Sequence, residues 1–572
     1  MSASATPGPE DAGDASPRAG TGTRIASAAG IMVAAILLSR VLGLVRDIVV
    51  AYYFGASDVT DAYIAAFRLP DLLYFLIAGG ALSSAFIPVF TEYLTKGDEE
   101  SAWHVFSVFG TALTFLLTFI IVAGWIFTPW LLVPLAPGYL DDPSKFQLTV
   151  HLTRIVLPAQ LCFFIGGLMM STLYARQHFL FPALGPVVYN IAIIIGGAIG
   201  GQFWGPVRGI DGLAWGVVVG AFLGNVVMQL WMLRRLGVRY HFSLNVRHEG
   251  VVRVAKLMLP VLLGLSLPYL CVILSTPFAS DLGDRPVTWL DRANKLMQMP
   301  LGIFAQALSV AIFPTLSALA AQQDWDGFRK QFSLGIRSVL FLTIPSAVLI
   351  IILAVPLSAI LFQHGKGTWE DTVATASAAG VYALAIFAVS AQQVVNRGFY
   401  SRQNTVTPML VGSGATFVFL ALNVLLLGIP GQKSVVSFAQ QVHGSKLLAL
   451  AYVLAMAIYL TVLLVLFQRA MGGIRGREIA ASVVRVIVAS VLMGAAAWGA
   501  QGLFHQWLVP YGPGGVRTLG TLAEILLCSG VGGVVYLAAV KLMRVPEAEF
   551  VFDAVSRRFA RFGRRGQTPA AK

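Results

Sequence analysis

The chain alternates between long apolar runs and short polar connections. A helix needs about 20 mostly apolar residues to cross the hydrocarbon core of a bilayer, and fourteen runs are long enough. The runs are continuous, unlike the alternating segments of about ten residues that build a transmembrane β-barrel. This pattern predicts an all-α polytopic membrane protein with about 14 transmembrane helices. The predicted spans are residues 29–54, 73–95, 104–134, 149–174, 183–204, 210–233, 254–279, 289–320, 336–363, 374–396, 407–430, 447–468, 480–503 and 518–543.

The composition excludes a soluble globular enzyme. Hydrophobic residues make up 57% of the chain and charged residues 12%, and the mean hydropathy is +0.76. Soluble proteins carry about 25% charged residues. The three cysteines, Cys162, Cys271 and Cys528, lie far apart in apolar runs, so we expect them to be packing residues rather than a disulfide or metal framework.

The basic residues lie mainly on one side of the predicted membrane. Connections after even-numbered spans carry 17 Lys and Arg residues, whereas connections after odd-numbered spans carry 8. The stretch from Lys541 to the C-terminus adds 8 more to the even side. Because Lys and Arg gather on the cytoplasmic side, both termini are predicted to be cytoplasmic.

The sequence contains an internal repeat with an offset of 226 positions. The segment YARQ at 174–177 recurs as YSRQ at 400–403. The segment ALSSAFIP at 81–88 recurs as ALSVAIFP at 307–314, with the same offset. Two matches in register indicate duplication of a six-span unit. Since six is even, the two copies have parallel topology.

The repeat predicts two pseudo-symmetric six-helix lobes around a central cavity. Residues 28–236 form the N-lobe and residues 250–470 the C-lobe, and residues 478–545 supply two further helices. Residues 1–27 are expected to be a disordered cytoplasmic tail, and residues 546–572 a basic cytoplasmic tail that lies on anionic lipid rather than on nucleic acid. Facing lobes are typical of transporters that work by alternating access.

Charged residues interrupt the first predicted span. Arg40, Arg46 and Asp47 lie within it, and Arg40 and Asp47 share a helix face because they are two turns apart. A cation at mid-membrane costs about 2.5–3.5 kcal/mol even on the lenient insertion scale. These side chains are therefore expected to face a polar cavity rather than lipid.

The eighth predicted span carries a second polar set. Arg292, Lys295 and Gln298 follow one another at a spacing of three residues, which places neighbours close together on a helix. A cavity with excess positive charge selects anions, and Arg binds phosphate oxygens in bidentate fashion while Lys adds a point charge. Together with the apolar spans, this set predicts a lipid-linked phosphate as the ligand.

Motifs for other chemistry are incomplete. Gly365-Lys366-Gly367-Thr368 is similar to part of a P-loop, but Ile360 stands where the first glycine of that motif belongs. The eight histidines are scattered, and the sequence shows no metal-ligand or nucleophile motif. We therefore expect neither an enzyme nor a bound cofactor or metal.

Five segments of the chain are distinctive: SRVLGLVRD (39–47), FGASDVTDAYIAAFRLPDLL (54–73), GGALSSAFIPVFTEY (79–93), ANKLMQMPLGIF (293–304) and FYSRQNTVTP (399–408). They resemble the MviN/MurJ family of the multidrug/oligosaccharidyl-lipid/polysaccharide exporter superfamily. The resemblance covers about residues 28–545.

The resemblance implies a flippase with fourteen spans, two lobes and a central cationic cavity. Such a protein moves lipid II, the undecaprenyl-diphosphate-linked peptidoglycan precursor, from the cytoplasmic to the outer leaflet for cell-wall synthesis. It implies a location in the bacterial cytoplasmic (inner) membrane, and a groove for the lipid tail along residues 478–545. The expected partners are lipid II and membrane lipids, with cell-wall synthesis proteins as further candidates. The chain is expected to act as a monomer.

The resemblance also assigns site residues by position. Arg40, Arg46 and Asp47 match charges in the first span of the family, and Asp61 matches an acidic position at the entrance to the cavity. Lys295 stands where the family usually has Arg, so the charge is kept and the bidentate geometry is lost.

The chain also departs from the family. Tyr74-Phe75 replaces one or two arginines of many members, and Gly79 replaces a glutamate of some. Spans 7, 11 and 12 contain no Asp or Glu, which argues against sodium coupling through the carboxylate site that some members have there.

Three alternatives stay open at the level of the sequence. The chain could export another polyprenyl-linked oligosaccharide, or cationic drugs, although drug export would favour buried carboxylates and Asp47 is nearly alone in its span. It could also be a scaffold of a cell-wall complex that transports nothing. A membrane enzyme acting on polyprenyl phosphate would need clustered carboxylates or paired histidines at the membrane surface.

Overall fold

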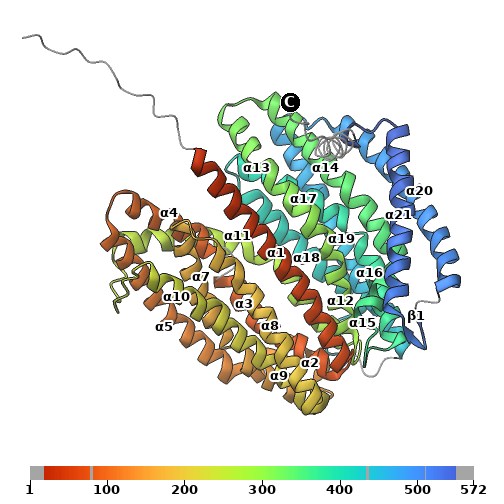
Figure 1. Cartoon of the computed structure of the whole chain (residues 1–572), viewed down its shortest axis with the longest axis horizontal. Helices are drawn as coiled ribbons and strands as arrows, with labels where there is room; N and C mark the ends of the chain where they lie inside the picture. Colours follow the sequence, from red (N-terminus) through yellow and green to blue (C-terminus); the bar gives the residue numbers. More distant parts are fainter. Residues whose placement is uncertain (1–18, 78–80, 433–436, 509–510, 549–572) are drawn as a thin grey trace, which may run out of the picture.

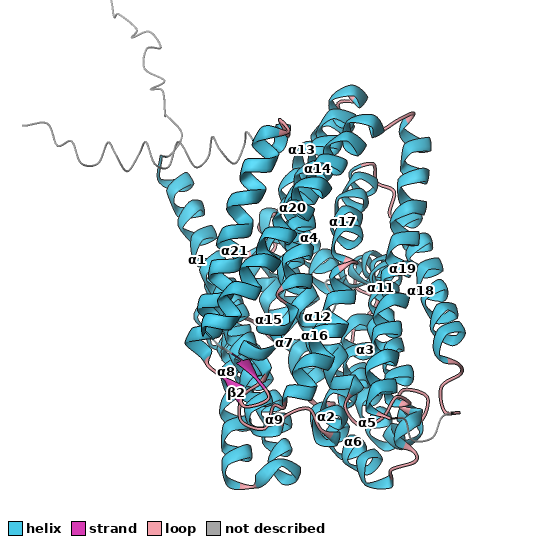
Figure 2. Ribbon diagram, turned by 90° about the vertical axis from the view of Figure 1, so that its right-hand side faces the viewer, coloured by secondary structure: helices cyan, strands magenta, loops and turns pink. Residues whose placement is uncertain are grey.

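The computed structural model describes residues 19–77, 81–432, 437–508 and 511–548, and most of them lie in helices. In the described part, the one sheet is an antiparallel hairpin of β1 (Tyr511–Gly512) and β2 (Gly515–Val516). Figure 2 shows that the longer helices run roughly parallel, and that the hairpin lies at the same end of the molecule as α2 and α9.

The first half of the chain forms one group of helices, coloured red to yellow in Figure 1. Helix α1 runs along the junction between this group and the rest of the molecule. The elements of this N-lobe are α1 (Ala19–Phe54), α2 (Asp58–Ala66), α3 (Arg68–Ile77), α4 (Ala81–Thr95), α5 (Glu99–Leu132), the 3-10 turn Pro137–Tyr139, α6 (Pro143–Val156), α7 (Ala159–Ala175), α8 (Leu180–Phe203), α9 (Gly205–Ala221), the π-helical turn Phe222–Val227 and α10 (Met228–Arg235).

The second half forms the C-lobe, and two further helices pack on its outer side (Figure 1). Those two helices are α20 (Gly476–Leu508) and α21 (Thr518–Leu542). The C-lobe itself consists of α11 (Glu249–Ser280), α12 (Pro286–Pro300), the π-helical turn Leu301–Ala305, α13 (Gln306–Ala321), α14 (Trp325–Ile352), α15 (Ala354–Phe362), α16 (Trp369–Ala383), α17 (Ile386–Ser401), α18 (Val406–Leu427) and α19 (Phe438–Met471). The predicted helical fold with two lobes and two extra helices is confirmed.

The number of spans is the part of the prediction that stays open. Ten helices in the described part are long and apolar enough to cross a membrane, or eleven if α16 and α17, bent by 43°, count as one. The other three predicted spans fall on α1, on α3 with α4, and on α11. Each of the fourteen predicted runs therefore lies on a helix or a helix pair.

The two lobes share local backbone conformations, as the repeat predicts. Gln177 has φ 63° and Gln403, 226 positions later, has φ 58°. Gly97 and Gln323 form a second such pair, with φ 77° and 56°. Positive φ is uncommon for residues other than glycine, so its recurrence in register supports the duplication.

The predicted N-terminal tail is too long. Residues 1–27 were expected to be disordered, yet α1 begins at Ala19. Alanine is frequent from residue 26 to residue 35 and favours a helix, and α1 continues from there towards the N-terminus. Residues 1–18 of the tail, and residues 549–572 of the basic C-terminal tail, lie outside the described residues.

A seam of glycines holds α8 against α9. A Cβ atom placed on Gly200 would lie 2.2 Å from the carbonyl oxygen of Gly209, and one on Gly196 would lie 2.2 Å from that of Gly212. Small residues allow helix backbones to approach closely in a membrane protein. This seam makes α8 and α9 a tightly packed pair within the N-lobe.

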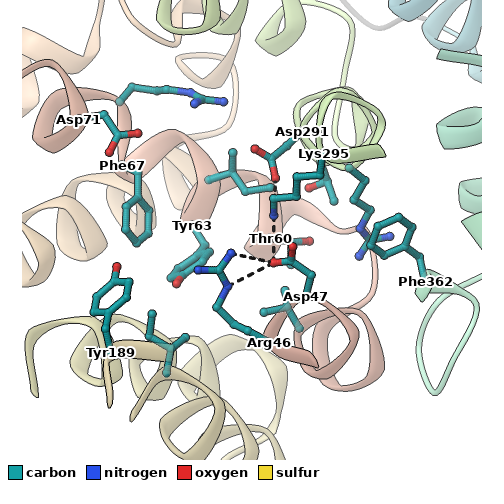
Figure 3. Close-up of a pocket in the computed structure, with 16 residues that line it drawn as sticks. Arg46, Asp47, Thr60, Tyr63, Phe67, Asp71, Tyr189, Asp291, Lys295 and Phe362 are labelled. Carbon is teal, nitrogen blue, oxygen red and sulfur yellow. Dashed lines mark hydrogen bonds and ion pairs between the residues drawn. The ribbon is translucent and has the colours of Figure 1, made fainter. Parts of the chain in front are cut away.

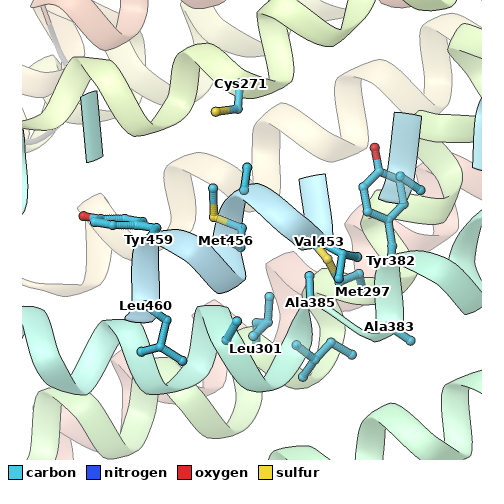
Figure 4. Close-up of a cluster of buried hydrophobic side chains, with 14 of the residues drawn as sticks. Cys271, Met297, Leu301, Tyr382, Ala383, Ala385, Val453, Met456, Tyr459 and Leu460 are labelled. Carbon is cyan, nitrogen blue, oxygen red and sulfur yellow. The ribbon is translucent and has the colours of Figure 1, made fainter. Parts of the chain in front are cut away.

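The C-lobe has the largest cluster of buried apolar side chains. Figure 4 shows part of it, where Met297 and Leu301 of the α12 segment lie near Met456 and Leu460 of α19. Cys271 is buried within this cluster, and all three cysteines are free, as predicted for packing residues. The core gives α12, which carries the polar set of the eighth span, a fixed position in the lobe.

Candidate functional site

A cavity of about 260 Å³ lies between the two lobes. Its wall is built from α1, α2, α3 and α8 of the N-lobe and from α12 and α15 of the C-lobe (Figure 3). The lining residues are Arg46, Asp47, Val50, Thr60, Tyr63, Ile64, Phe67, Arg68, Asp71, Tyr189, Ile193, Thr288, Asp291, Arg292, Lys295 and Phe362.

Asp47 joins cations from both lobes across this cavity. Its Oδ1 atom accepts hydrogen bonds from Nε and Nη2 of Arg46, at 3.2 and 3.1 Å. The same oxygen accepts a hydrogen bond from Nζ of Lys295 on α12, at 3.0 Å. Figure 3 shows the three side chains converging. One carboxylate oxygen therefore holds two cations that approach from different lobes.

Each of these cations has a second partner within its own lobe. Nη1 of Arg46 donates to Oδ1 of Asn190 on α8, at 3.2 Å. Nζ of Lys295 lies 2.9 Å from Oδ2 of Asp291, one turn earlier on α12. The second partners fix the positions of both cations, so these can stay in place if another anion replaces Asp47.

Arg292 forms a contact between the two lobes beside the cavity. Its Nη2 atom donates to the backbone carbonyl of Gly55 at 2.6 Å, and its guanidinium lies 5.0 Å from the ring centroid of Phe362. The residue is 4% exposed. Its Nη1 atom is buried and has no hydrogen-bond partner, so one donor stays available to a ligand.

The cavity carries one positive charge in excess. Among the described residues that line it, four are cationic and three are carboxylates. The cations are Arg46, Arg68, Arg292 and Lys295, and the carboxylates are Asp47, Asp71 and Asp291. Guanidinium and ammonium groups that converge in this way suit the oxygens of a phosphate or diphosphate.

Asp61 lies at the junction of the lobes rather than at an open entrance. It is fully buried, and its Oδ1 atom accepts hydrogen bonds from the backbone N–H of Thr288, at 2.8 Å, and from the Thr288 hydroxyl. A carboxylate in this position caps the first turn of α12 and suits its helix dipole. Asp61 therefore links α2 of one lobe to α12 of the other.

Lys145 adds a cation to the same junction. Its Nζ atom lies 3.6 Å from Asp61, 3.8 Å from Asp58 and 3.4 Å from Asp284 of the C-lobe. Its side chain is 2% exposed. These contacts, together with the Arg292–Gly55 bond, close the two lobes on each other at the end of α1 that lies near Phe54.

Besides Asp61, two other predicted site residues lie outside the cavity wall. Arg40 is exposed on α1 and donates to Oε1 of Gln306 at 3.2 Å, so it bridges to the C-lobe two turns away from Arg46. Gln298 is exposed and donates to Asn294 on its own helix. Arg46, Asp47, Arg292 and Lys295 are the predicted residues that the fold brings to the cavity.

The structure also adds lining residues that the sequence pattern did not indicate. Arg68 and Asp71 belong to the segment RLPD. The hydropathy pattern predicts this segment to be a connection between two spans, because it precedes an apolar run. Tyr63 and Tyr189 come from α2 and α8 and face each other across the wall (Figure 3). The spacing of Arg68 and Asp71, three residues apart on one helix face, is the signal that could have found them.

Comparison with known proteins identifies the family. The family model described as "Lipid II flippase MurJ" matches residues 50–512. The chain belongs to the MurJ family. The relatives include the lipid II flippase MurJ of Burkholderia cenocepacia, which is 32% identical over 400 residues, covering 69% of this chain and 77% of the relative. The probable lipid II flippase MurJ of Haemophilus influenzae is 29% identical over 489 residues, covering 82% and 92%.

Solved structures support the MurJ fold. The chain is similar to "Lipid II flippase MurJ, inward closed conformation", with a TM-score of 0.71 and 21% identity over 90% of this chain and 98% of that one. It is also similar to an inward-facing multidrug transporter of the MATE family, with a TM-score of 0.61 and 13% identity over 77% and 98%. At these identities the likeness concerns the fold. The resemblance read from the sequence segments is confirmed.

Proposed function

We propose that this MurJ-family chain is a lipid II flippase, a transporter and not an enzyme. The observation that carries the proposal is the arrangement of Arg46, Asp47 and Lys295 in the cavity between the lobes. Family relatives named as lipid II flippases support the same substrate. The head of lipid II contains a diphosphate, which needs cations, and its polyprenyl tail needs an apolar surround.

The diphosphate takes the place of the Asp47 carboxylate. Arg46 and Lys295 each keep a second partner, Asn190 and Asp291, so they stay in position when Asp47 releases them. Arg46 can then grip phosphate oxygens in bidentate fashion, and Lys295 adds a point charge from the other lobe. Because the two cations belong to different lobes, the bound anion joins the lobes.

Alternating access follows from the closed junction. The contacts of Asp61, Lys145 and Arg292 hold the lobes together at one end. For the substrate to leave at that end, these contacts have to break while the lobes close at the opposite end. The substrate head then passes from one membrane face to the other, and the tail stays in lipid alongside α20 and α21.

The proposal includes a membrane location and an orientation for the chain. The chain acts as a monomer in the bacterial cytoplasmic membrane with both termini in the cytoplasm, in line with the bias of basic residues. The closed junction near Phe54 then faces outward and the other end of α1 faces the cytoplasm. Partners in cell-wall synthesis would meet the protein at either face.

The test is depletion and complementation. The host's own lipid II flippase is depleted, and outer-leaflet lipid II is measured in cells that express this chain. Wild type should restore export, whereas Lys295→Ala should not, because the C-lobe loses its cation for the diphosphate. Lys446→Ala, which removes an exposed cation from α19, is the matched control and should restore export like wild type.

Two results would contradict the proposal. If well-inserted wild type leaves lipid II in the inner leaflet, the substrate is a different polyprenyl-linked oligosaccharide, and the same cells should then be assayed with other lipid-linked glycans. If Lys295→Ala restores export as well as wild type does, the cavity cations do not hold the diphosphate.

A further inference from the structure

The two C-terminal helices contain a carboxylate that the transport mechanism does not use. Glu524 is the one acidic residue within the described length of α21, and it is 0% exposed. It lies six residues from the start of that helix, about 9 Å along its axis. An ionised carboxylate in such a place is costly unless it is paired, so its partners decide what it does.

The partners of Glu524 are an imidazole and a phenol. Nδ1 of His505, near the end of α20, lies 3.4 Å from Oε2 of Glu524. The hydroxyl of Tyr511, in the β1–β2 hairpin, donates to Oε1 at 2.9 Å. Gln501 donates to that same hydroxyl at 3.3 Å. Of this group, only the imidazole of His505 can become a cation by binding a proton.

The imidazole is also the partner that reaches the surface of the molecule. The side chain of His505 is 40% exposed, whereas that of Glu524 is 0% exposed. A proton that arrives from solvent at the exposed edge of His505 therefore reaches a group in direct contact with a buried carboxylate. Nothing in the MurJ assignment above accounts for this pairing.

We propose that Glu524 and His505 form a proton-binding site that controls the docking of the β1–β2 hairpin on the C-lobe. With the imidazole protonated, the charge of Glu524 is balanced and the buried pair is stable. When the proton leaves, Glu524 keeps neutral hydrogen-bond donors and lacks a counter-charge. The burial cost then favours a state in which the helix pair and its hairpin shift so that the carboxylate reaches water.

Other titratable groups around the site do not supply that counter-charge. The Tyr511 hydroxyl faces Glu524 from the hairpin, and the Cys528 thiol faces it from the next turn of α21. Neither group carries positive charge. Helix α15, which also packs on α21, and the last half of α14 contain no titratable side chain. His505 is therefore the cation that can balance Glu524 among the described neighbours.

The hairpin connects this site to the wall of the cavity. The backbone carbonyl of Gly512 accepts a hydrogen bond from Nε2 of Gln363 at 2.6 Å. Gln363 directly follows Phe362, which lines the cavity beneath Arg292. In the same loop, the backbone N–H of Lys366 donates to the carbonyl of Tyr52 on α1, at 3.0 Å. A shift of the hairpin therefore acts on the loop that joins both lobes at their closed junction.

The proton site depends on the contacts of Glu524 with His505 and Tyr511, and not on transport. An effect of the bound proton on the closed junction during flipping rests on the proposed function. Docking of the hairpin can be measured without lipid II, so the proton site can fail or hold independently of the transport role.

The test measures how firmly the hairpin is docked at different pH values. The purified full-length protein in lipid nanodiscs is subjected to hydrogen–deuterium exchange, with rates corrected for the intrinsic effect of pH. The pH is varied between about 5.5 and 8, on either side of the ordinary histidine range. Over this range, the protection of residues 505–517 in the wild type should fall by about tenfold, because loss of the proton favours the undocked hairpin.

Variants separate the proton site from a purely structural role. Glu524→Gln keeps the shape and the acceptor for Tyr511 but has no charge, so its hairpin protection should be independent of pH. His505→Gln, at a half-exposed position that tolerates substitution, should also be independent of pH and should give low protection throughout. Glu547→Gln, whose carboxylate pairs with Arg337 at the other end of the helix pair, is the control and should keep the wild-type pH response.

Each outcome bears on the proton site or on its role in transport. A wild-type hairpin whose protection does not change with pH, or a Glu524→Gln hairpin that still responds, would overturn the proton site. A pH response in a protein that fails the lipid II test would keep the proton site and overturn the transport role.

Discussion

At the scale of single residues, Asp47 is the centre of the site. It holds Arg46 and Lys295 together, at 3.1 and 3.0 Å. Two cations from different lobes would repel each other without it. The carboxylate therefore stabilises the pair of cations, and in the proposed function the substrate anion displaces it.

Removal of the Asp47 charge should strengthen the binding of a free diphosphate. In Asp47→Asn the cations keep an acceptor of the same shape, but the competing negative charge is gone. A hydrogen bond to a charged group contributes about 1.5–3 kcal/mol, so inorganic pyrophosphate should bind about tenfold more tightly or better. Isothermal titration calorimetry on the purified protein measures this affinity.

The matched control for this experiment is Asp71→Asn. Asp71 lines the same cavity beside Arg68 but does not contact Arg46 or Lys295. Its substitution removes the same charge from the cavity and should have a smaller effect. Equal gains in the two variants would mean that the total charge of the cavity, rather than displacement of Asp47, sets the affinity.

The sequence revealed part of this residue set. Arg46, Asp47, Arg292 and Lys295 could be predicted because a charge inside an apolar run is costly and needs a polar surround. Asp61 was found only by resemblance, since an acidic residue in a connection has no such cost. Lys145 could not be found, because its carboxylates come from α2 and from the segment before α12, which only the folded chain brings together.

At the scale of elements, the segment from α12 to α13 differs most from a simple span. Its first turn is capped by Asp61 from the other lobe, and a π-helical turn, Leu301–Ala305, follows Pro300. Hydropathy predicts the length of such a segment but not its irregular turn, since apolar character does not depend on the hydrogen-bonding pattern of the backbone. The same limit explains why the bend between α16 and α17 was not predicted.

The glycine seam gives a prediction for the N-lobe. Gly200→Val should push α8 away from α9, because the new side chain would overlap the backbone of Gly209. Overpacking of this kind costs about 1–3 kcal/mol, and the melting temperature in detergent should fall. Gly499→Val on α20, where a Cβ meets nothing within 4 Å, is the control and should melt like wild type. Equal melting of the two variants would show that α8 and α9 can separate without loss of stability.

At the scale of the whole molecule, a group of buried polar contacts joins the lobes at the end of α1 near Phe54. Lys145 is central there because it is a buried cation shared by carboxylates of both lobes. Removal of one partner of a buried ionic group destabilises the arrangement, because the remaining charge loses its compensation. The closed junction should therefore depend on Lys145 more than on any exposed charge nearby.

Lys145→Met should open this junction. In a background without the native cysteines, Ala56→Cys reports on it, since Ala56 is 8% exposed and belongs to the buried cluster with Trp289. A maleimide that does not cross membranes, added outside intact cells, should label Ala56→Cys slowly and should label the combination with Lys145→Met several-fold faster. Lys446→Met is the control, and equal labelling in all three would mean that Lys145 does not hold the lobes together.

The uneven burial of this junction has a consequence for the habitats a cell can tolerate. Cells hold their internal salt steady but meet water outside that ranges from dilute to saline. Exposed ion pairs weaken as the Debye length shrinks, from about 10 Å at 0.1 M salt to about 3 Å at 1 M, whereas buried pairs are screened much less. The contact of Lys145 that crosses the lobes ends on Asp284, which is 67% exposed, whereas its contact with Asp61 within the N-lobe is buried. In the proposed orientation, with this junction facing outward, saline water weakens the contact between the lobes and leaves the buried pair within the N-lobe nearly unchanged. The junction then opens more easily as the salt outside rises.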